Sequence, residues 1–232
     1  MMIVAFMGVG GSGKTTNARL FYQLLKKANI EVEYRTEFDY VILKPITRLI
    51  EKKMPSVRSQ FTEISSKKKP SYFKLWPFIL WLDFLLLWLS IRFNSKKTFV
   101  FDRYIHDFLP AWEFLDYNNK IMRLFYLKFP KPDIVFYIDV DPKVAVDRKY
   151  GNILSQSYQN DIVKFYSKVS QYYEWMIKYL DIPKVKSGPT IQKTFSQILY
   201  YLQKRSSTDS SINDLITRLE SSRKSRNITN ND

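Results

Sequence analysis

The sequence contains no cysteine and a single histidine, His106, among its 232 residues. The absence of cysteine excludes disulfide bonds and argues against a small secreted protein held together by them. Because the thiol and imidazole groups that usually bind zinc are almost missing, we expect no zinc site. No basic segment with a cleavage site precedes the first apolar run, so we expect no signal peptide and a cytoplasmic protein.

Acidic residues are scarce relative to basic ones, with 22 Asp and Glu against 37 Lys and Arg and a net charge of +15. Such an excess favours anionic partners, which could be nucleotides, nucleic acid or a membrane surface. Much of the positive charge lies between Lys44 and Lys69. Because the sequence has no recognisable nucleic-acid-binding module, we expect a basic face around a phosphate site rather than nucleic-acid binding.

Long apolar stretches are also absent, apart from Leu75–Ile91, which carries one charge, Asp83. This stretch is slightly short for a membrane span, and Pro77 and the central Asp83 argue against one. A helix that is apolar nearly all round is typical of a helix buried on several sides. We therefore expect residues 75–91 to form a buried helix that also makes a homodimer interface, with Trp81 and Trp88 on one face.

Glycine is rare, yet four of the six glycines lie in Gly8-Val9-Gly10-Gly11-Ser12-Gly13-Lys14-Thr15, directly after the apolar run Ile3–Met7. The run predicts a buried strand, and the glycines allow a tight turn whose N–H groups face a polyphosphate. A helical pattern follows, so its N-terminal dipole points at the phosphates. This is the pattern of a P-loop, in which Lys14 reaches the β/γ-phosphates and the Thr15 hydroxyl binds Mg²⁺. We expect ATP and Mg²⁺ to bind at the following residues: Gly8, Gly10, Gly11, Ser12, Gly13, Lys14, Thr15 and Thr16.

Strands and helices alternate along the rest of the chain. Further strands are predicted at Glu31–Arg35, Thr98–Phe101, Ile134–Ile138 and Lys184–Val185. Helices are predicted at about Tyr40–Lys53, Lys143–Lys149, Ile162–Leu180 and Ile191–Lys204. Such alternation predicts an α/β fold of the P-loop NTPase class, three-layer α/β/α, with a mostly five-stranded parallel sheet. We expect one domain over residues 1–204 and a polar, mobile tail over 205–232, which is poor in apolar residues. The alternative for part of this tail is a short amphipathic turn around Ile212–Leu219.

Two charged residues follow the strand at Thr98–Phe101. Asp102 is placed to hold Mg²⁺ or a metal-bound water, and Arg103 carries a cation to the phosphoryl group in transfer. The alternative is a structural Asp–Arg pair that ends the strand. The Asn-Lys-x-Asp signature of GTPases is absent. His106 follows one helical turn later, and we expect it on the surface or at the start of a helix.

Three segments together resemble the thymidylate kinase family: residues 8–16, Asp102-Arg103-Tyr104, and residues 132–149 with their Asp139-Val140-Asp141-Pro142 string. They occur in the family's order, and the resemblance covers about residues 2–203. It implies transfer of the γ-phosphoryl group of ATP to a nucleoside monophosphate, with dTMP converted to dTDP and Mg²⁺ as cofactor.

The resemblance also implies roles for individual residues. Arg48 matches the arginine that grips the acceptor phosphate, and Arg103 the one between the two phosphate sites. Arg148 begins a lid over about residues 149–161 and contacts the donor, and Lys186 lies in the loop near the donor base. We expect four residues to bind the acceptor: Phe38, Arg48, Arg103 and Tyr104.

The chain departs from thymidylate kinases at several positions. Gly10 replaces an acidic residue that holds the acceptor sugar, and Gly11 replaces an arginine found in some members. Asp83 and its neighbours occupy the place of the base-recognising arginine. No Lys or Arg occurs between Tyr150 and Asp161.

Glu37 supports a rival interpretation. A carboxylate just past the second strand is where deoxynucleoside kinases keep a general base for a substrate hydroxyl, whereas a monophosphate acceptor needs no base. A kinase of a nucleoside or another hydroxyl acceptor, with Glu37 as catalytic base, therefore remains open. So does a nucleotide-dependent switch or a DNA-associated ATPase, which the positive charge and the tail suggest.

Overall fold

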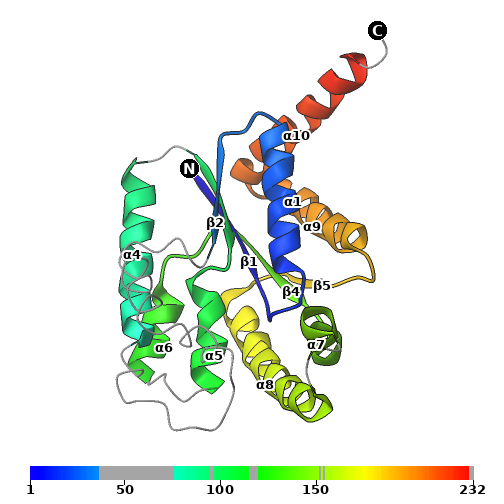
Figure 1. Ribbon diagram of the computed structural model, residues 1–232. Helices are drawn as coiled ribbons and strands as arrows, with labels where there is room; N and C mark the ends of the chain where they lie inside the picture. Colours follow the sequence, from blue (N-terminus) through cyan, green and yellow to red (C-terminus); the bar gives the residue numbers. More distant parts are fainter. Residues whose placement is uncertain (37–75, 95–96, 115–119, 152, 154, 230–232) are drawn as a thin grey trace, which may run out of the picture.

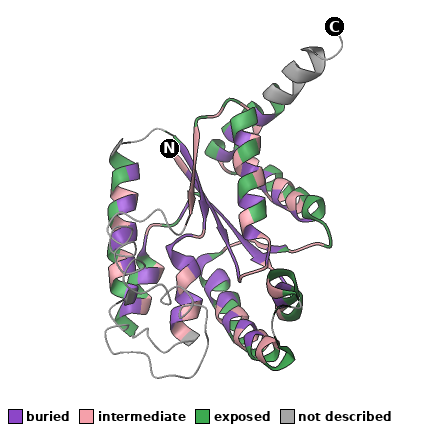
Figure 2. Ribbon diagram, viewed as in Figure 1, coloured by how far each residue is buried: buried purple, intermediate pink, exposed green. Residues whose placement is uncertain are grey.

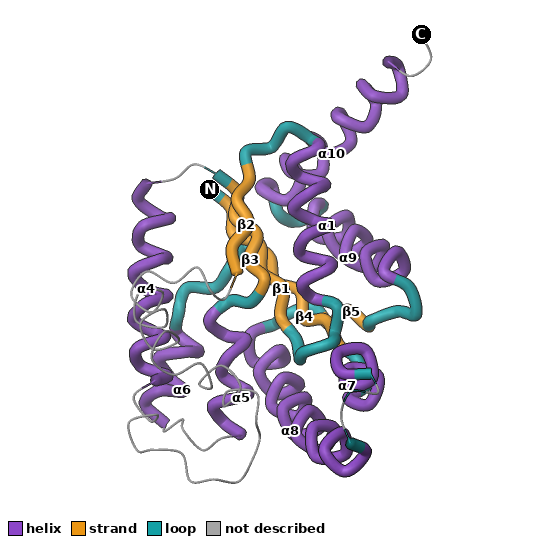
Figure 3. Tube along the Cα trace, viewed as in Figure 1, coloured by secondary structure: helices purple, strands orange, loops and turns teal. Residues whose placement is uncertain are grey.

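The computed structural model describes residues 1–36, 76–94, 97–114, 120–151, 153 and 155–229. At its centre lies a five-stranded sheet with the order β2-β3-β1-β4-β5, in which every paired strand is parallel (Figures 1 and 3). The strands are β1 (Met2–Met7), β2 (Val32–Thr36), β3 (Thr98–Asp102), β4 (Ile134–Asp139) and β5 (Lys184–Lys186). Each predicted strand is confirmed within two residues, and so is the α/β fold class.

The helices of the described residues connect these strands and cover the sheet. They are α1 (Lys14–Lys27), α4 (Trp76–Asn94), α5 (Leu109–Phe114), α6 (Lys120–Lys128), α7 (Pro142–Tyr150), α8 (Gln156–Leu180), α9 (Ile191–Ser206) and α10 (Ser210–Thr229). A short 3-10 helix, η2, spans Ile105–Phe108. The helix predicted near residues 40–53 lies outside the described residues.

Alternate residues of the central strand β1 enter two separate cores. Ile3, Ala5 and Met7 pack with α4, η2, α5, α6 and α8, whereas Val4 and Phe6 pack with α1, α9 and α10. Figure 1 shows these two groups of helices on opposite faces of the sheet. Because successive side chains of a strand point to opposite faces, an all-apolar strand requires a helical layer on both sides. The predicted three-layer architecture is confirmed.

Strand β1 is the point at which the strand order reverses. It pairs with β3 on one side, where Phe6 lies opposite Asp102, and with β4 on the other, where Met7 lies opposite Tyr137. In open parallel sheets, ligands bind beyond the carboxyl ends of the strands at such a switch point. The loop after Met7 therefore occupies the expected ligand-binding place.

Helix α4 packs one face on the core and leaves a second apolar face exposed (Figure 2). Leu80, Phe84, Leu87 and Ile91 are buried, at spacings of three or four residues. Trp81 and Trp88 are partly buried against the same core, and Trp81 Nε1 donates a hydrogen bond to the carbonyl oxygen of Phe125 on α6, 3.1 Å away. Over the described residues, no helix combines the length and the apolar character needed to cross a lipid bilayer.

The C-terminal segment differs from the predicted mobile tail. Helix α10 buries Ile212, Leu215 and Leu219 in the core that also holds α1 and α9. These apolar residues recur at i, i+3 and i+7, which is the spacing of one helix face. The expectation of a segment too polar to pack is therefore wrong for residues 210–219. The alternative, a short amphipathic turn around Ile212–Leu219, agrees with the structure at these residues.

Of the two positions expected for His106, the structure supports the start of a helix and not the surface. It lies in η2, as a helix-start residue, but it is buried rather than on the surface. Its ring stacks on Tyr104. Burial, followed by the charge of Lys131, lowers the pKa of His106 to about 4, so the folded protein holds this ring neutral.

Candidate functional site

The glycine-rich segment forms a compact loop between the end of β1 and the start of α1. Gly11 has a φ of 81°, and a Cβ atom built on it would lie 2.1 Å from the carbonyl oxygen of Ala145. A side chain at this position would strain the backbone, because φ is positive, and would clash with α7. Glycine is therefore required at residue 11, which explains why an arginine found in some thymidylate kinases cannot stand there in this chain.

Lys14 lies inside the curve of this loop. Its side chain is buried, and its Nζ atom donates a hydrogen bond to the carbonyl oxygen of Val9, 3.2 Å away. The loop is closed by a second hydrogen bond from the Ser12 amide to the same carbonyl oxygen, also 3.2 Å. A buried ammonium within a ring of backbone N–H groups at a helix N-terminus is a strong site for phosphate oxygens.

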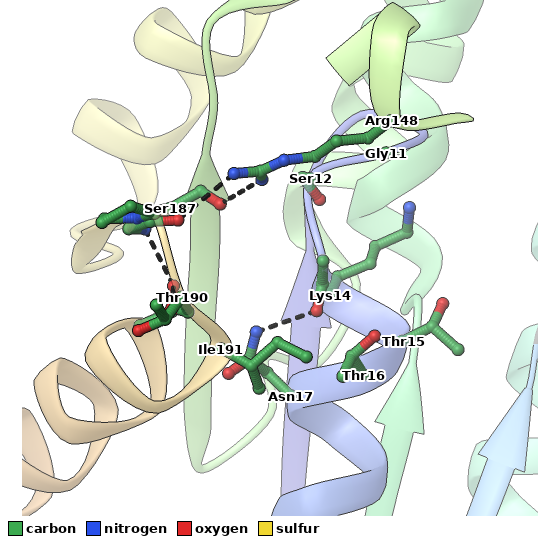
Figure 4. A pocket seen from close by; sticks show the side chains of 14 residues that line it. Gly11, Ser12, Lys14, Thr15, Thr16, Asn17, Arg148, Ser187, Thr190 and Ile191 are labelled. Atoms are coloured by element: carbon green, nitrogen blue, oxygen red, sulfur yellow. Dashed lines mark hydrogen bonds between the residues drawn. The ribbon is translucent and has the colours of Figure 1, made fainter. Parts of the chain in front are cut away.

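A cavity of about 380 Å³ opens beside the loop. Its lining comprises residues 11–17, Arg148, residues 187–191 and Thr194. The predicted residues Gly11, Ser12, Gly13, Lys14, Thr15, Thr16 and Arg148 are thus brought together (Figure 4). A volume of this order suits a small molecule.

Arg148 connects the two walls of this cavity. From the last turn of α7 it donates to Ser187 Oγ at 2.8 Å and to the carbonyl oxygen of Gly188 at 3.2 Å (Figure 4). The Gly188 amide in turn donates to Thr194 Oγ1 of α9 at 2.8 Å. The cavity wall opposite the loop is therefore held by hydrogen bonds from two helices. Lys186, predicted near the donor base, lies one residue before this wall and is not part of the lining.

Asp102 ends β3 beside the loop, opposite Phe6 of β1. Asp102 is mostly buried, and Oδ1 has no hydrogen-bond partner among the described residues. Oδ2 accepts from the hydroxyl of Tyr34 at 3.3 Å. Burial, and then the Asp102 charge, raises the pKa of Tyr34 to about 12, so Tyr34 stays a donor that orients the carboxylate.

The oxygen atoms of Asp102 and Thr15 suit Mg²⁺, which needs few ligands from the protein, better than they suit a metal that the protein alone must coordinate. Mg²⁺ binds oxygen ligands and commonly takes one or two from the protein, the rest coming from phosphates and water. Asp102 and the Thr15 hydroxyl supply such oxygens. Within the described ranges, no group of three or more His, Cys, Asp or Glu side chains could form a metal cage.

Arg103 follows Asp102 in an unusual backbone conformation, with a φ of 77°. Its amide donates to the carbonyl oxygen of Phe6 in β1, 3.1 Å away. Its Nη1 atom lies 2.5 Å from Oδ2 of Asp107, and about a quarter of the side chain is exposed. The turn after β3 is thus attached to the end of β1, which places Arg103 next to the phosphate loop.

Tyr104 occupies a position different from the predicted one. It is almost fully buried among Phe84, Phe101 and Phe129, and its hydroxyl donates to the carbonyl oxygen of Pro130 at 3.1 Å. Burial raises the pKa of this phenol well above its ordinary value. The prediction that Tyr104 contacts the acceptor is therefore corrected: it supports the turn that carries Arg103.

Two side chains that the sequence did not single out lie against Gly10. A Cβ atom built on Gly10 would lie 2.5 Å from the hydroxyl oxygen of Tyr166 and 3.0 Å from Nζ of Lys149. Lys149 also lies over the ring of Tyr150, 4.9 Å from its centroid. The space of a larger loop side chain is therefore filled by a hydroxyl and an ammonium. Spacing along the chain carries no signal for this contact, because α7 and α8 meet the loop only in three dimensions.

The remaining predicted residues, Glu37, Phe38 and Arg48, lie outside the described residues. The donor side and the end of β3 are therefore described, whereas these three expected acceptor residues remain predictions.

No protein-family model matches the chain. Among curated proteins, a probable thymidylate kinase of Sulfurisphaera tokodaii is 29% identical over 145 residues, which covers 62% of this chain and 67% of the relative. A probable thymidylate kinase of Sulfolobus acidocaldarius is 26% identical over 188 residues, 79% of this chain and 84% of the relative. The thymidylate kinase of Rickettsia typhi is 23% identical over 173 residues, with 72% and 78% covered. The chain is thus similar to three thymidylate kinases over 62–79% of its length.

This relationship confirms the family resemblance of the three motifs. Among solved structures, the thymidylate kinase of Ehrlichia chaffeensis aligns with a TM-score of 0.59 at 19% identity, over 87% of this chain and 98% of that one. A likeness at this identity speaks for the fold, and it agrees with the P-loop NTPase class inferred from the sequence.

Proposed function

We propose that this protein is a nucleoside monophosphate kinase that transfers the γ-phosphoryl group of ATP to dTMP, giving dTDP and ADP. The observation that carries the proposal is the phosphate loop around buried Lys14, with Asp102 and Arg103 at the end of the adjoining strand. The names of the three curated relatives support dTMP as the acceptor.

In this reaction an oxygen of the acceptor phosphate attacks the γ-phosphorus, and the bond to the β,γ-bridging oxygen breaks as ADP leaves. The protein contributes position and charge rather than covalent chemistry. Lys14 and the loop N–H groups hold the β- and γ-phosphates, and Arg103 adds a second cation at the edge of the loop. Thr15 and Asp102 are the residues that would hold Mg²⁺, which neutralises phosphate charge when bound. Arg148, with the wall at Ser187 and Gly188, holds the rest of the donor nucleotide.

A hydroxyl-acceptor kinase is the second candidate, and one observation favours it. Tyr166 and Lys149 fill the space beside Gly10, where thymidylate kinases hold the acceptor sugar with an acidic side chain. The acceptor subsite of this chain therefore differs chemically from the family pattern. In this alternative Glu37 would take the proton from the substrate hydroxyl.

A nucleotide-dependent switch or DNA-associated ATPase requires no acceptor, so phosphoryl transfer to any small acceptor would exclude it as the main function.

A panel of nucleosides and nucleoside monophosphates, offered with radiolabelled ATP, tests the proposal. We expect label on a monophosphate, with dTMP labelled fastest. In that case Arg48→Ala should raise the acceptor KM strongly, because a charge-assisted contact with a dianion is lost, and Glu37→Gln should matter less. The opposite ranking, with labelled nucleoside and a collapse of kcat in Glu37→Gln, would establish the second candidate instead.

We also propose that two copies of the chain associate through α4 and α6. Phe78, Leu82 and Leu86 form an exposed apolar stripe on α4, 36–45% exposed. On α6, Ile121 and Leu124 are 65% and 56% exposed. The two helices pack together, with the rings of Trp81 and Phe125 in edge contact at 5.0 Å. An apolar surface of this kind favours a partner, and a two-fold copy of the same surface closes on itself. We propose in addition that the enzyme works in the cytoplasm, because a chain without cysteine has no disulfide bonds that would need an oxidising compartment.

A further inference from the structure

We propose that Asp107 is a positioning residue, which sets the place of Arg103 relative to the phosphate loop. The proposal rests on the phosphoryl-transfer function inferred above. Asp107 lies in η2, five residues past the end of β3, and none of its side chain is exposed. It contacts three separate segments of the chain.

The contacts of Asp107 join the loop, the Arg103 turn and α8. Oδ1 accepts a hydrogen bond from the Gly8 amide at 2.7 Å and another from the Tyr173 hydroxyl at 2.6 Å. Oδ2 accepts from Nη1 of Arg103 at 2.5 Å. The backbone carbonyl oxygen of Asp107 accepts from the same Tyr173 hydroxyl at 3.1 Å. One carboxylate therefore binds both the first residue of the phosphate loop and the guanidinium of Arg103.

The negative charge of Asp107 explains why these contacts are costly to break. A fully buried carboxylate is costly unless it is paired and hydrogen-bonded, so loss of either partner is strongly disfavoured. Tyr173 is held as a donor, because burial and then the Asp107 charge raise its pKa well above the ordinary value. No side chain fits at Gly8, since its φ is 144° and a Cβ atom there would lie 2.7 Å from the carbonyl oxygen of Ile138.

This contact bears on function, because it fixes the position of an arginine that is still partly exposed. Asp107 contacts one nitrogen of the guanidinium, about a quarter of the Arg103 side chain is exposed, and the Arg103 amide donates to the carbonyl oxygen of Phe6 near the start of the loop. The buried carboxylate also offsets part of the arginine charge. Asp107 thereby determines where this cation sits during transfer, whereas it is too deeply buried to touch the substrate itself.

The Asp107→Asn variant tests this role, since it keeps the shape and an acceptor for Gly8 but removes the charge that holds Arg103. We expect kcat to fall by about tenfold to a hundredfold, as for a displaced catalytic group, while the KM for ATP changes by less than about threefold. In an Arg103→Met background the same change should have little further effect, because the group it positions is gone.

Glu113→Gln is the matched control. Glu113 is also a buried carboxylate paired with an arginine, at 2.5 Å and 2.6 Å from Arg123, but it lies between α5 and α6. A merely structural role for Asp107 would make both variants lose thermal stability and keep kcat. If Asp107→Asn does not fold, Tyr173→Phe decides, because it removes one donor from Asp107 and should lower kcat by about twofold or more at constant KM.

Wild-type activity separates this proposal from the one on which it rests. A wild type that labels no acceptor would remove the proposed function and the positioning role with it. An active wild type together with an equally active, folded Asp107→Asn variant would overturn the positioning role alone. A fall in kcat that persists in the Arg103→Met background would overturn it as well, because Asp107 would then not act through Arg103.

Discussion

The guanidinium of Arg148 donates a hydrogen bond to Ser187 Oγ, 2.8 Å away, and so joins the end of α7 to the loop before α9. These residues lie 39 positions apart in the sequence, and both line the cavity beside the phosphate loop. The contact places a fixed cation in the lining of this cavity, where we propose that the donor nucleotide binds.

Arg148→Ala should therefore weaken donor binding. Loss of a charge-assisted contact should raise the KM for ATP by about tenfold, with a smaller change in kcat. Steady-state kinetics with ATP varied at saturating acceptor measures both constants. Ser187→Ala, which keeps the arginine and removes only its anchor, should have a smaller effect. A change confined to the acceptor KM would contradict the assignment of this wall to the donor.

Lys14→Ala should remove charge stabilisation of the transition state. The expected loss is a few kcal/mol, or about a hundredfold or more in kcat/KM. The Lys26→Ala variant, changed at an exposed lysine in the last turn of the same helix, should retain activity. Unchanged turnover by a folded Lys14→Ala protein would sink the kinase proposal.

The apolar stripe on α4 gives a test of the dimer. Leu82→Lys and Leu86→Lys should each shift the protein from dimer to monomer in sedimentation velocity, because a charge would be buried at the two-fold contact. Trp81 and Trp88, which the sequence suggested for this test, are partly buried against the core and are unsuitable. Ile153→Lys, at a residue 87% exposed elsewhere on the surface, is the control. A wild type that sediments as a monomer at micromolar concentration would refute the interface.

Stability should fall in mildly acidic solution because of His106. Its pKa is lowered from 6.5 to about 4 in the folded protein, by burial and then by Lys131. Between these values the unfolded chain binds the extra proton and the folded chain does not. The contribution is therefore present above pH 6.5 and is lost as the pH falls towards 4, by about 3 kcal/mol in total.

His106→Gln should remove this pH dependence. Urea unfolding at pH 7 and pH 4.5 would show a smaller loss of free energy of unfolding in the variant than in the wild type. An equal loss in both proteins would assign the acid sensitivity to other groups.

Leu215→Ala tests the packing of α10. Leu215 is 3% exposed in the core shared with α1 and α9, so truncation should cost about 2–5 kcal/mol in the free energy of unfolding. Glu220→Ala, at an exposed position of the same helix, should change it by less than about 0.5 kcal/mol. If residues 210–219 were instead mobile, neither variant would change the free energy of unfolding.

The phosphate loop was predictable from the sequence because its chemistry is local. An apolar strand, a run of glycines and a lysine at the start of a helix are consecutive in the chain, so residues 3–15 predicted both the turn and its ligand. Strands β1, β3 and β4 were predictable for a similar reason, since strands buried on both faces are continuous apolar runs. Asp107 follows Arg103 by four residues, a spacing that favours an ion pair, so this contact also lies within the reach of sequence reasoning.

Tertiary structure alone decided which side chains surround that loop. Tyr34, Tyr166, Tyr173 and Lys149 come from β2, α8 and α7, and they reach the site because the sheet reverses its order at β1. Likewise Tyr104 adjoins Arg103 in sequence but points into the core, and Leu215 lies in a polar segment but packs on α1 and α9. The sequence by itself determined the loop and the strands and predicted a phosphate ligand, because backbone conformation and helix dipoles depend on neighbours in the chain. Contacts between residues far apart in the chain depend on how whole layers pack, and only the folded structure specifies them.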